Sequence, residues 1–231
     1  MPADQNTTPG LVIAVDGPSG SGKSSTARGV AHRLGLRYLD TGAMYRAVTW
    51  WMLQHGVAVD DPGAVAAHSD KPQITSGTDP ETPTIHVDGI DVAVEIRTQE
   101  VTTAVSPVSA VPEVRRRLVD LQRQAVSAVD TGIVVEGRDI GTVVCPDAPL
   151  KIYLTADPSA RAARRNAELT GTPVTVAETQ AALARRDEID SGRAAAPLTK
   201  ADDAVWLDTT ELTLDEAIQA VVDLAEDRRR A

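Results

Sequence analysis

The chain has 231 residues and a formal net charge of −10 at neutral pH, from 23 basic and 33 acidic residues. This length fits one domain with additions, or two small domains. Apolar residues make up 42% and charged residues 24%, so the chain can bury a core and is not disordered as a whole. The acidic balance disfavours a nucleic-acid partner, because binding to a phosphate backbone needs a basic surface.

Cysteine, histidine and apolar runs exclude several further classes. The single cysteine, Cys145, excludes an internal disulfide and a cysteine-based zinc cage, and the four histidines lack the spacing of metal ligands. The first ten residues do not resemble a secretory signal, and no apolar run approaches the ~20 residues of a membrane span. We expect a cytoplasmic protein without a membrane partner, in which residues 1–10 are a disordered lead and residues 11–231 form one folded domain.

Apolar runs and helical periods alternate along the chain. Residues 11–15 form a continuous apolar run, typical of a strand buried on both faces, and a helix follows from Lys23 until Gly35. A short strand at 37–39 and a helix at 43–55 come next. Further along, we expect helices at about 97–105 (with Pro107 near its end), 112–128, 158–168, 175–190 and 213–229, and strands at 133–136, 151–155 and 204–207. This alternation predicts a three-layer α/β fold, with a parallel sheet flanked by helices.

Residues 57–96 differ from this pattern, because proline, glycine, aspartate and threonine become frequent. The stretch TPTIHVDGIDVAV alternates around Asp88-Gly89, a residue pair preferred in type I′ hairpin turns. The sequence therefore predicts a small antiparallel β insert within the parallel fold.

The first apolar run leads into a candidate phosphate-binding loop. Residues 17–24 read GPSGSGKS and match the pattern G-x-x-x-x-G-K-[ST], between a predicted strand and a predicted helix. The glycines allow backbone conformations that direct successive N–H groups inward, and the helix adds the positive end of its dipole. We expect Lys23 to reach the β- and γ-phosphates of a nucleoside triphosphate, and Ser24 to bind Mg²⁺. The structural alternative is a glycine-rich turn before an ordinary helix.

A phosphate loop alone does not distinguish a kinase from a motor or a switch. The base-reading N-K-x-D segment of GTPases and the L-S-G-G-Q segment of ABC-type ATPases are both absent. The segment DTGAMYR follows the second predicted strand, at the edge of a parallel sheet where ligands bind. Helix capping explains Asp40 or Thr41 but leaves Arg46 unexplained. Transfer of a phosphoryl group to a small acceptor is therefore favoured.

Five segments in one order closely resemble bacterial cytidylate kinases: GPSGSGKSS, LDTGAMYRAVTW, EIRTQEV, VVEGRDIGTVVCPDAPLKIYLTA and RRDEIDSGRAAAPL. The resemblance extends from about Val12 to the final helix. It implies a P-loop nucleoside monophosphate kinase, with a monophosphate-binding insert at about 57–107 and a helical lid at about 157–175. It also implies Mg²⁺-dependent transfer of a phosphoryl group from ATP to CMP or dCMP in pyrimidine metabolism. We expect a monomer.

The resemblance assigns residues to each substrate. The ATP-binding set is Gly17, Pro18, Ser19, Gly20, Ser21, Gly22, Lys23, Ser24, Ser25, Arg161 and Arg165. The set for the acceptor nucleotide is Thr41, Tyr45, Arg46, Arg115, Glu136, Arg138, Arg186, Asp190 and Arg193. Within these sets, Glu136 and Arg138 are assigned to cytosine and Arg193 to the transferring phosphates, while Asp139 is placed near the metal. The catalytic set is Lys23, Arg138, Asp139 and Arg193.

Each of these assignments has a structural alternative. Arg115 is one of three consecutive arginines, which cannot all face one way. Arg138 and Asp139 are also compatible with a local ion pair in a turn. The spacing of Arg161, Arg164 and Arg165 places Arg161 and its partners on one helix face. These arginines and the group of Arg186, Asp190 and Arg193 are also compatible with a salt-bridged helix surface. Two other functions remain open: a P-loop kinase for UMP, AMP or a metabolite, and a non-catalytic nucleotide-binding regulator.

Overall fold

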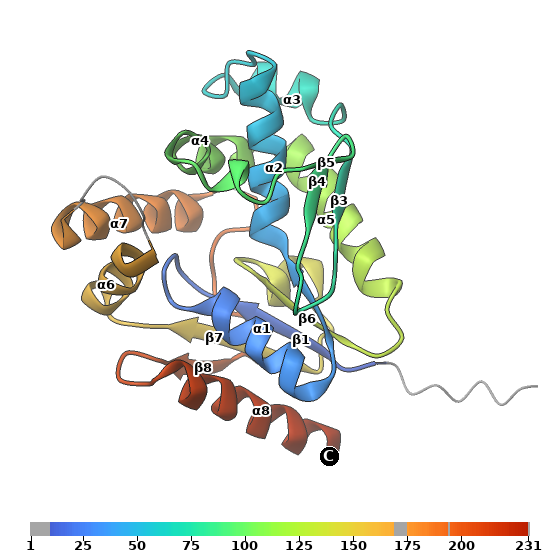
Figure 1. Cartoon of the computed structure of the whole chain (residues 1–231), viewed down its shortest axis with the longest axis vertical. Helices are drawn as coiled ribbons and strands as arrows, with labels where there is room; N and C mark the ends of the chain where they lie inside the picture. The colour runs from blue at the N-terminus through green and yellow to red at the C-terminus, as the bar shows by residue number, and fades with distance from the viewer. Residues whose placement is uncertain (1–9, 169–174, 194, 231) are drawn as a thin grey trace, which may run out of the picture.

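The computed structural model describes residues 10–168, 175–193 and 195–230 (Figure 1). Nearly all of the predicted lead, residues 1–9, and residues 169–174 of the predicted lid lie outside the described residues. The central sheet has five strands, all parallel, in the order β2-β6-β1-β7-β8. These strands are β1 (Val12–Asp16), β2 (Arg37–Asp40), β6 (Ile133–Gly137), β7 (Leu150–Thr155) and β8 (Val205–Asp208).

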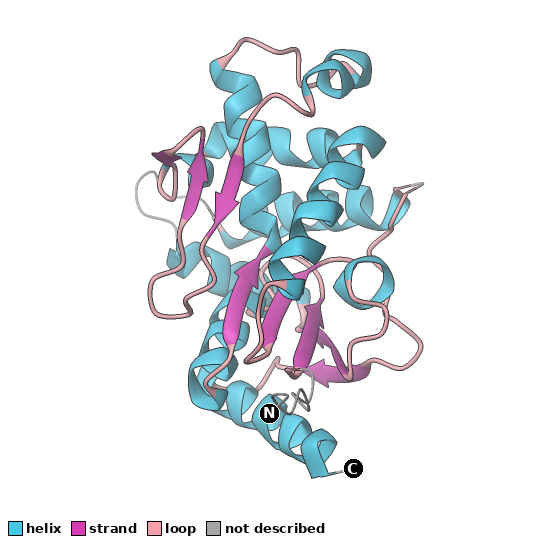
Figure 2. Cartoon of the chain, turned by 90° about the vertical axis from the view of Figure 1, so that its right-hand side faces the viewer, coloured by secondary structure: helices cyan, strands magenta, loops and turns pink. Residues whose placement is uncertain are grey.

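Helices cover both faces of this sheet, as the alternation of strands and helices predicts (Figures 1 and 2). The α-helices are α1 (Lys23–Leu34), α2 (Thr41–Gln54), α3 (Pro62–His68), α4 (Gln99–Ala110), α5 (Pro112–Ser127), α6 (Pro158–Glu168), α7 (Val176–Gly192) and α8 (Leu214–Arg230). In β1, Ile13 and Val15 pack with α1 and α8, whereas Ala14 belongs to the cluster formed with α2, α4 and α5. A strand buried on both faces explains the continuous apolar run.

A second, antiparallel sheet lies apart from the central sheet (Figure 2) and confirms the predicted hairpin. It consists of β3 (Ile74–Ser76), β4 (Ile85–Val87) and β5 (Ile90–Asp91). The turn residues Asp88 and Gly89 have φ angles of 52° and 81°, the left-handed conformation that a type I′ turn needs at both positions. The Asp88 carboxylate also accepts hydrogen bonds from Trp51 Nε1 on α2 (2.9 Å) and from the Gln73 backbone N–H (2.7 Å).

Three features differ from the sequence prediction. The insert also contains α3, which begins with an Asp61 cap and Pro62 at its first turn. Helix α4 continues through Pro107 to Ala110, because Val105 and Val108 are buried on either side of the proline and their packing outweighs the lost hydrogen bond. Two short helical turns were not predicted: the 3₁₀ turn η1 (Glu95–Arg97) and the π-helical turn η2 (Ile140–Val144). None of the described helices is long and apolar enough to cross a bilayer.

The turn at Asp88 gives the first testable prediction. Asp88→Ala removes the acceptor of two hydrogen bonds and places alanine in a left-handed conformation, so the free energy of unfolding falls by about 1–3 kcal/mol. Asp88→Asn loses less, because asparagine tolerates this conformation and keeps one acceptor oxygen. Urea unfolding of the three proteins measures the difference, and equal stability of Asp88→Ala and the wild type would contradict the role of this carboxylate.

Candidate active site

Three strands of the central sheet end beside one another. In the parallel register, Asp40 of β2 lies opposite Glu136 of β6, and Gly137 of β6 lies opposite Asp16 of β1. The segments that follow β1, β2 and β6 therefore emerge at the same edge of the sheet. They line a cavity of about 470 Å³, which is completed by residues of the insert, α4, α5 and α7.

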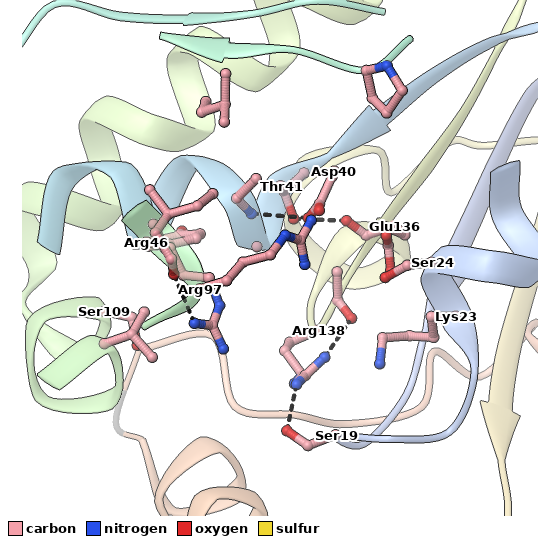
Figure 3. Close-up of a pocket in the computed structure, with 18 of the residues that line it drawn as sticks. Ser19, Lys23, Ser24, Asp40, Thr41, Arg46, Arg97, Ser109, Glu136 and Arg138 are labelled. Carbon is pink, nitrogen blue, oxygen red and sulfur yellow. Dashed lines mark hydrogen bonds between the residues drawn. The ribbon is translucent and has the colours of Figure 1, made fainter. Parts of the chain in front are cut away.

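Most of the predicted site residues line this cavity, although they come from distant parts of the chain (Figure 3). Lys23 and Ser24 lie on one side, Thr41 and Arg46 on the other, with Glu136 and Arg138 between them. The predicted residues on the lining are Ser19, Gly20, Gly22, Lys23, Ser24, Ser25, Thr41, Tyr45, Arg46, Arg115, Glu136, Arg138, Asp139, Arg165, Arg186, Asp190 and Arg193. Gly17, Pro18, Ser21 and Arg161 do not line it.

The phosphate loop has the backbone that its glycines predict. Gly17, Gly20 and Gly22 have φ angles of 149°, 75° and 91°, and a Cβ atom on Gly17 would lie 2.0 Å from the carbonyl oxygen of Leu154. The Lys23 ammonium is buried and donates to the Pro18 carbonyl at 2.7 Å. Burial, together with the charge of Arg138, lowers the pKa of Lys23 below its ordinary value.

Guanidinium groups dominate the side of the cavity opposite the phosphate loop. Arg46 of α2 donates to the Ile96 carbonyl and to the Thr102 hydroxyl, both at 3.0 Å. Arg115 of α5 is buried, with its guanidinium 5.3 Å from the centre of the Tyr45 ring, and it forms an ion pair with Asp139.

The three consecutive arginines, residues 115–117, point in different directions, as expected for adjacent positions of a helix. Arg115 lines the cavity and Arg116 is exposed. Arg117 donates instead to the carbonyls of Ser69 and Pro72, at the base of the insert.

Helix α7 closes the cavity with charged groups. Arg138, after β6, donates to Asp190 of α7 (3.0 Å) and to the Ser19 hydroxyl (2.7 Å), and Arg193 donates to the Asp190 carbonyl (3.1 Å). Within the described part of the chain, Arg186 Nε and one terminal nitrogen of Arg193 are buried and lack a hydrogen-bond partner. Buried donors of this kind need an acceptor, and they lie at a cavity wall where an anionic ligand would supply one.

Comparisons with known proteins decide the family. The family model described as "Cytidylate kinase" matches residues 13–227. A protein named "Cytidylate kinase" from Streptomyces avermitilis is 60% identical over 97% of this chain and 96% of its own, and one from Nocardia farcinica is 56% identical over 90% of each chain. The chain belongs to the cytidylate kinase family. The structure of an uncharacterized protein from Eubacterium ventriosum (TM-score 0.52, 10% identity, 94% of this chain and 98% of that chain) shows the same fold.

The cavity of this cytidylate kinase family member includes residues that the sequence reasoning missed. Tyr38 donates to the Glu136 carboxyl at 2.5 Å, and burial raises the pKa of Glu136. Arg97 of η1 also lines the cavity. It belongs to the EIRTQEV segment, which supported the resemblance although none of its residues was assigned a role. Asp187 of α7 contacts the phosphate loop, and nothing in its spacing distinguishes it from an exposed helix residue.

Arg164 was likewise left without a role among the lid arginines. Its guanidinium donates to the Thr209 hydroxyl at 3.0 Å and to the Thr209 carbonyl at 2.5 Å. These two hydrogen bonds connect helix α6 to the loop that follows β8. Arg161 of the same helix donates instead to the Ser19 carbonyl at 3.0 Å, so these two arginines contact different parts of the protein.

Asp16, at the end of β1, holds the segment that follows β6. Its carboxylate accepts the backbone N–H groups of Ile140 (2.8 Å) and Gly141 (2.7 Å), in the turn directly after Arg138 and Asp139. Burial is the main reason that the pKa of Asp16 rises to about 6 from its ordinary 3.8. This buried carboxylate therefore fixes the backbone that presents two candidate catalytic residues.

The raised pKa of Asp16 predicts a pH dependence of stability. Between about pH 4 and pH 6 the native state holds more protons than the unfolded chain, so the free energy of unfolding falls as the pH rises. The variant Asp16→Asn lacks this proton, and wild-type stability should decrease relative to the variant by up to about 3 kcal/mol across this range. Urea unfolding at several pH values measures it. Parallel pH profiles for the two proteins would contradict the assignment.

Proposed function

We propose that this chain transfers the γ-phosphoryl group of ATP to CMP or dCMP, which gives ADP and CDP or dCDP. One observation carries the proposal: a single cavity joins a phosphate loop to a second, separate set of guanidinium groups from α2, α5 and α7. A nucleotide-dependent regulator needs only one phosphate site, whereas a kinase for monophosphates needs two that face each other. Family membership and the names of the relatives support cytidine as the acceptor base.

The chemistry requires little covalent help from the protein. The acceptor phosphate has a second pKa of roughly 6 and is already a nucleophile near neutral pH, so no general base is needed. The difficulty is to bring two polyanions into line. In the proposed mechanism the backbone amides of the phosphate loop and Lys23 bind the donor, and Arg46, Arg115 and Arg138 bind the acceptor. Arg193, which also lines the cavity, offsets the charge of the transferring group.

Magnesium fits the donor end of the cavity. The described residues hold no group of three or more histidine, cysteine, aspartate or glutamate side chains able to bind a metal alone. Mg²⁺ is usually held by one or two protein oxygens together with phosphates and water. The Ser24 hydroxyl, beside the Glu136 carboxyl, would hold it. When bound, the ion neutralises charge on the β- and γ-phosphates.

The proposal also covers the cellular location, the oligomeric state, the partners and the lid. We infer a cytoplasmic monomer in pyrimidine nucleotide metabolism, with ATP and a cytidine monophosphate as its partners. The net charge of −10 supports the absence of a nucleic-acid partner. The segment at about 157–175, which contains α6, serves in this proposal as the lid that excludes water during transfer.

An acceptor screen tests the proposed activity. With Mg²⁺ and ATP present, CMP and dCMP should give the highest kcat/KM for ADP release, above UMP, AMP, GMP and shikimate. The measurement is a coupled assay of ADP formation with each acceptor in turn. Dominant activity on AMP or shikimate would overturn the cytidine assignment, and nucleotide binding without any acceptor-dependent turnover would show a regulator.

Arg193 provides a test of the catalytic assignment. Its guanidinium stabilises charge that develops during transfer, so Arg193→Ala should lower kcat by about 10²- to 10³-fold, with a much smaller change in the KM for CMP. Arg185→Ala is the matched control, because Arg185 lies on the same helix with an exposed side chain. Unchanged turnover of Arg193→Ala would remove this residue from the mechanism.

A further inference from the structure

Asp187 of α7 binds the backbone of the phosphate loop directly. Its Oδ1 atom accepts the backbone N–H of Ser19 at 3.0 Å, and its other carboxylate oxygen contacts the Arg161 guanidinium. Arg161, which is buried, also donates to the Ser19 carbonyl at 3.0 Å. Both backbone polar groups of Ser19 are thus engaged by an ion pair between the helices α6 and α7.

The contacts of this carboxylate are those that a phosphate oxygen would make. Ser19 is the third residue of the phosphate loop, and an amide donor together with a guanidinium is a common arrangement for binding phosphate. One N–H carries one hydrogen, so Asp187 Oδ1 and a phosphate oxygen cannot both accept it at full strength. Arg161 Nε, in addition, is buried without a hydrogen-bond partner in the described part of the chain. The carboxylate therefore satisfies only part of this donor set.

A second carboxylate of α7 makes a related contact three residues further along. Asp190 accepts from Arg138, whose guanidinium also donates to the Ser19 hydroxyl. Residues three apart lie on one face of a helix. Helix α7 therefore directs Asp187 and Asp190 toward the phosphate loop and the arginines that contact it. Helix α7 is thus attached to the phosphate loop through anions.

We propose that Asp187 is a built-in competitor of ATP. Its carboxylate occupies the Ser19 amide and Arg161, and a bound triphosphate displaces it from both. The competition lowers the affinity for ATP and couples the position of α7 to occupation of the phosphate loop. The inference rests on the proposed function only in that the phosphate loop is taken as the donor site.

The opposite role makes the opposite prediction. If Asp187 only orients Arg161 toward the phosphates, its removal weakens triphosphate binding. If Asp187 competes with the phosphates, its removal strengthens binding, because the amide and the guanidinium are released. The sign of the change in affinity therefore decides between the two roles.

The test measures binding of inorganic tripolyphosphate and of ATP with Mg²⁺ to the full chain by calorimetry. Asp187→Asn should bind both ligands about three- to tenfold more tightly than the wild type. The increase corresponds to the partial loss of one charge-assisted contact between residue 187 and the groups that bind phosphate. Glu188→Gln removes the same charge from the neighbouring exposed position and should change the affinity less than twofold. Unchanged or weaker binding by Asp187→Asn, or equal strengthening by Glu188→Gln, would overturn the proposal.

A second readout does not depend on affinity. In ¹H–¹⁵N spectra without ligand, the Ser19 amide shift should differ between the wild type and Asp187→Ala, because only the wild type has a carboxylate on this N–H. At saturating tripolyphosphate the two Ser19 shifts should agree, because a phosphate oxygen is then the acceptor in both proteins. A Ser19 shift that still differs between the two proteins at saturation would contradict displacement. Because neither measurement uses CMP, loss of the proposed CMP kinase activity would be seen separately, in the acceptor screen.

Discussion

The site depends on one constraint: guanidinium groups are buried beside a single cavity, and each needs an anion or another acceptor to be stable there. Three ion pairs meet this need for Arg115, Arg138 and Arg161, whose partners are Asp139, Asp190 and Asp187 respectively. Each joins a different pair of segments: α5 to the loop after β6, that loop to α7, and α6 to α7. The positions of the segments around the cavity therefore follow from charge pairing as much as from the apolar core.

The central sheet provides the fixed side of this arrangement. Its parallel register places the ends of β1, β2 and β6 together, and both faces are packed against helices. The phosphate loop follows β1 without an intervening residue, so its backbone is positioned by the middle strand of the sheet. The insert and α7 complete the cavity from its other side, and neither adds a strand to the central sheet.

Local sequence patterns predicted the local structure, but they did not predict which charged side chains pair across the fold. The strand before Gly17, the helix that begins at Lys23 and the Asp88-Gly89 turn depend on neighbouring residues, and each was predicted correctly. Helix α4 was predicted to end too early because buried neighbours, which a sequence does not show, compensate for Pro107. The resemblance named Arg161 for ATP but missed its partner Asp187, since an acidic residue on a charged helix has the same pattern whether it faces solvent or the phosphate loop.

The central claim is that one cavity holds two phosphorylated nucleotides end to end. A bisubstrate analogue, cytidine and adenosine joined at their 5′ positions through five phosphates, tests it most directly. The account predicts that this compound inhibits competitively against both ATP and CMP and binds more tightly than either nucleotide, because one molecule satisfies both sets of cations. Inhibition competitive with only one of the two substrates would contradict a shared cavity.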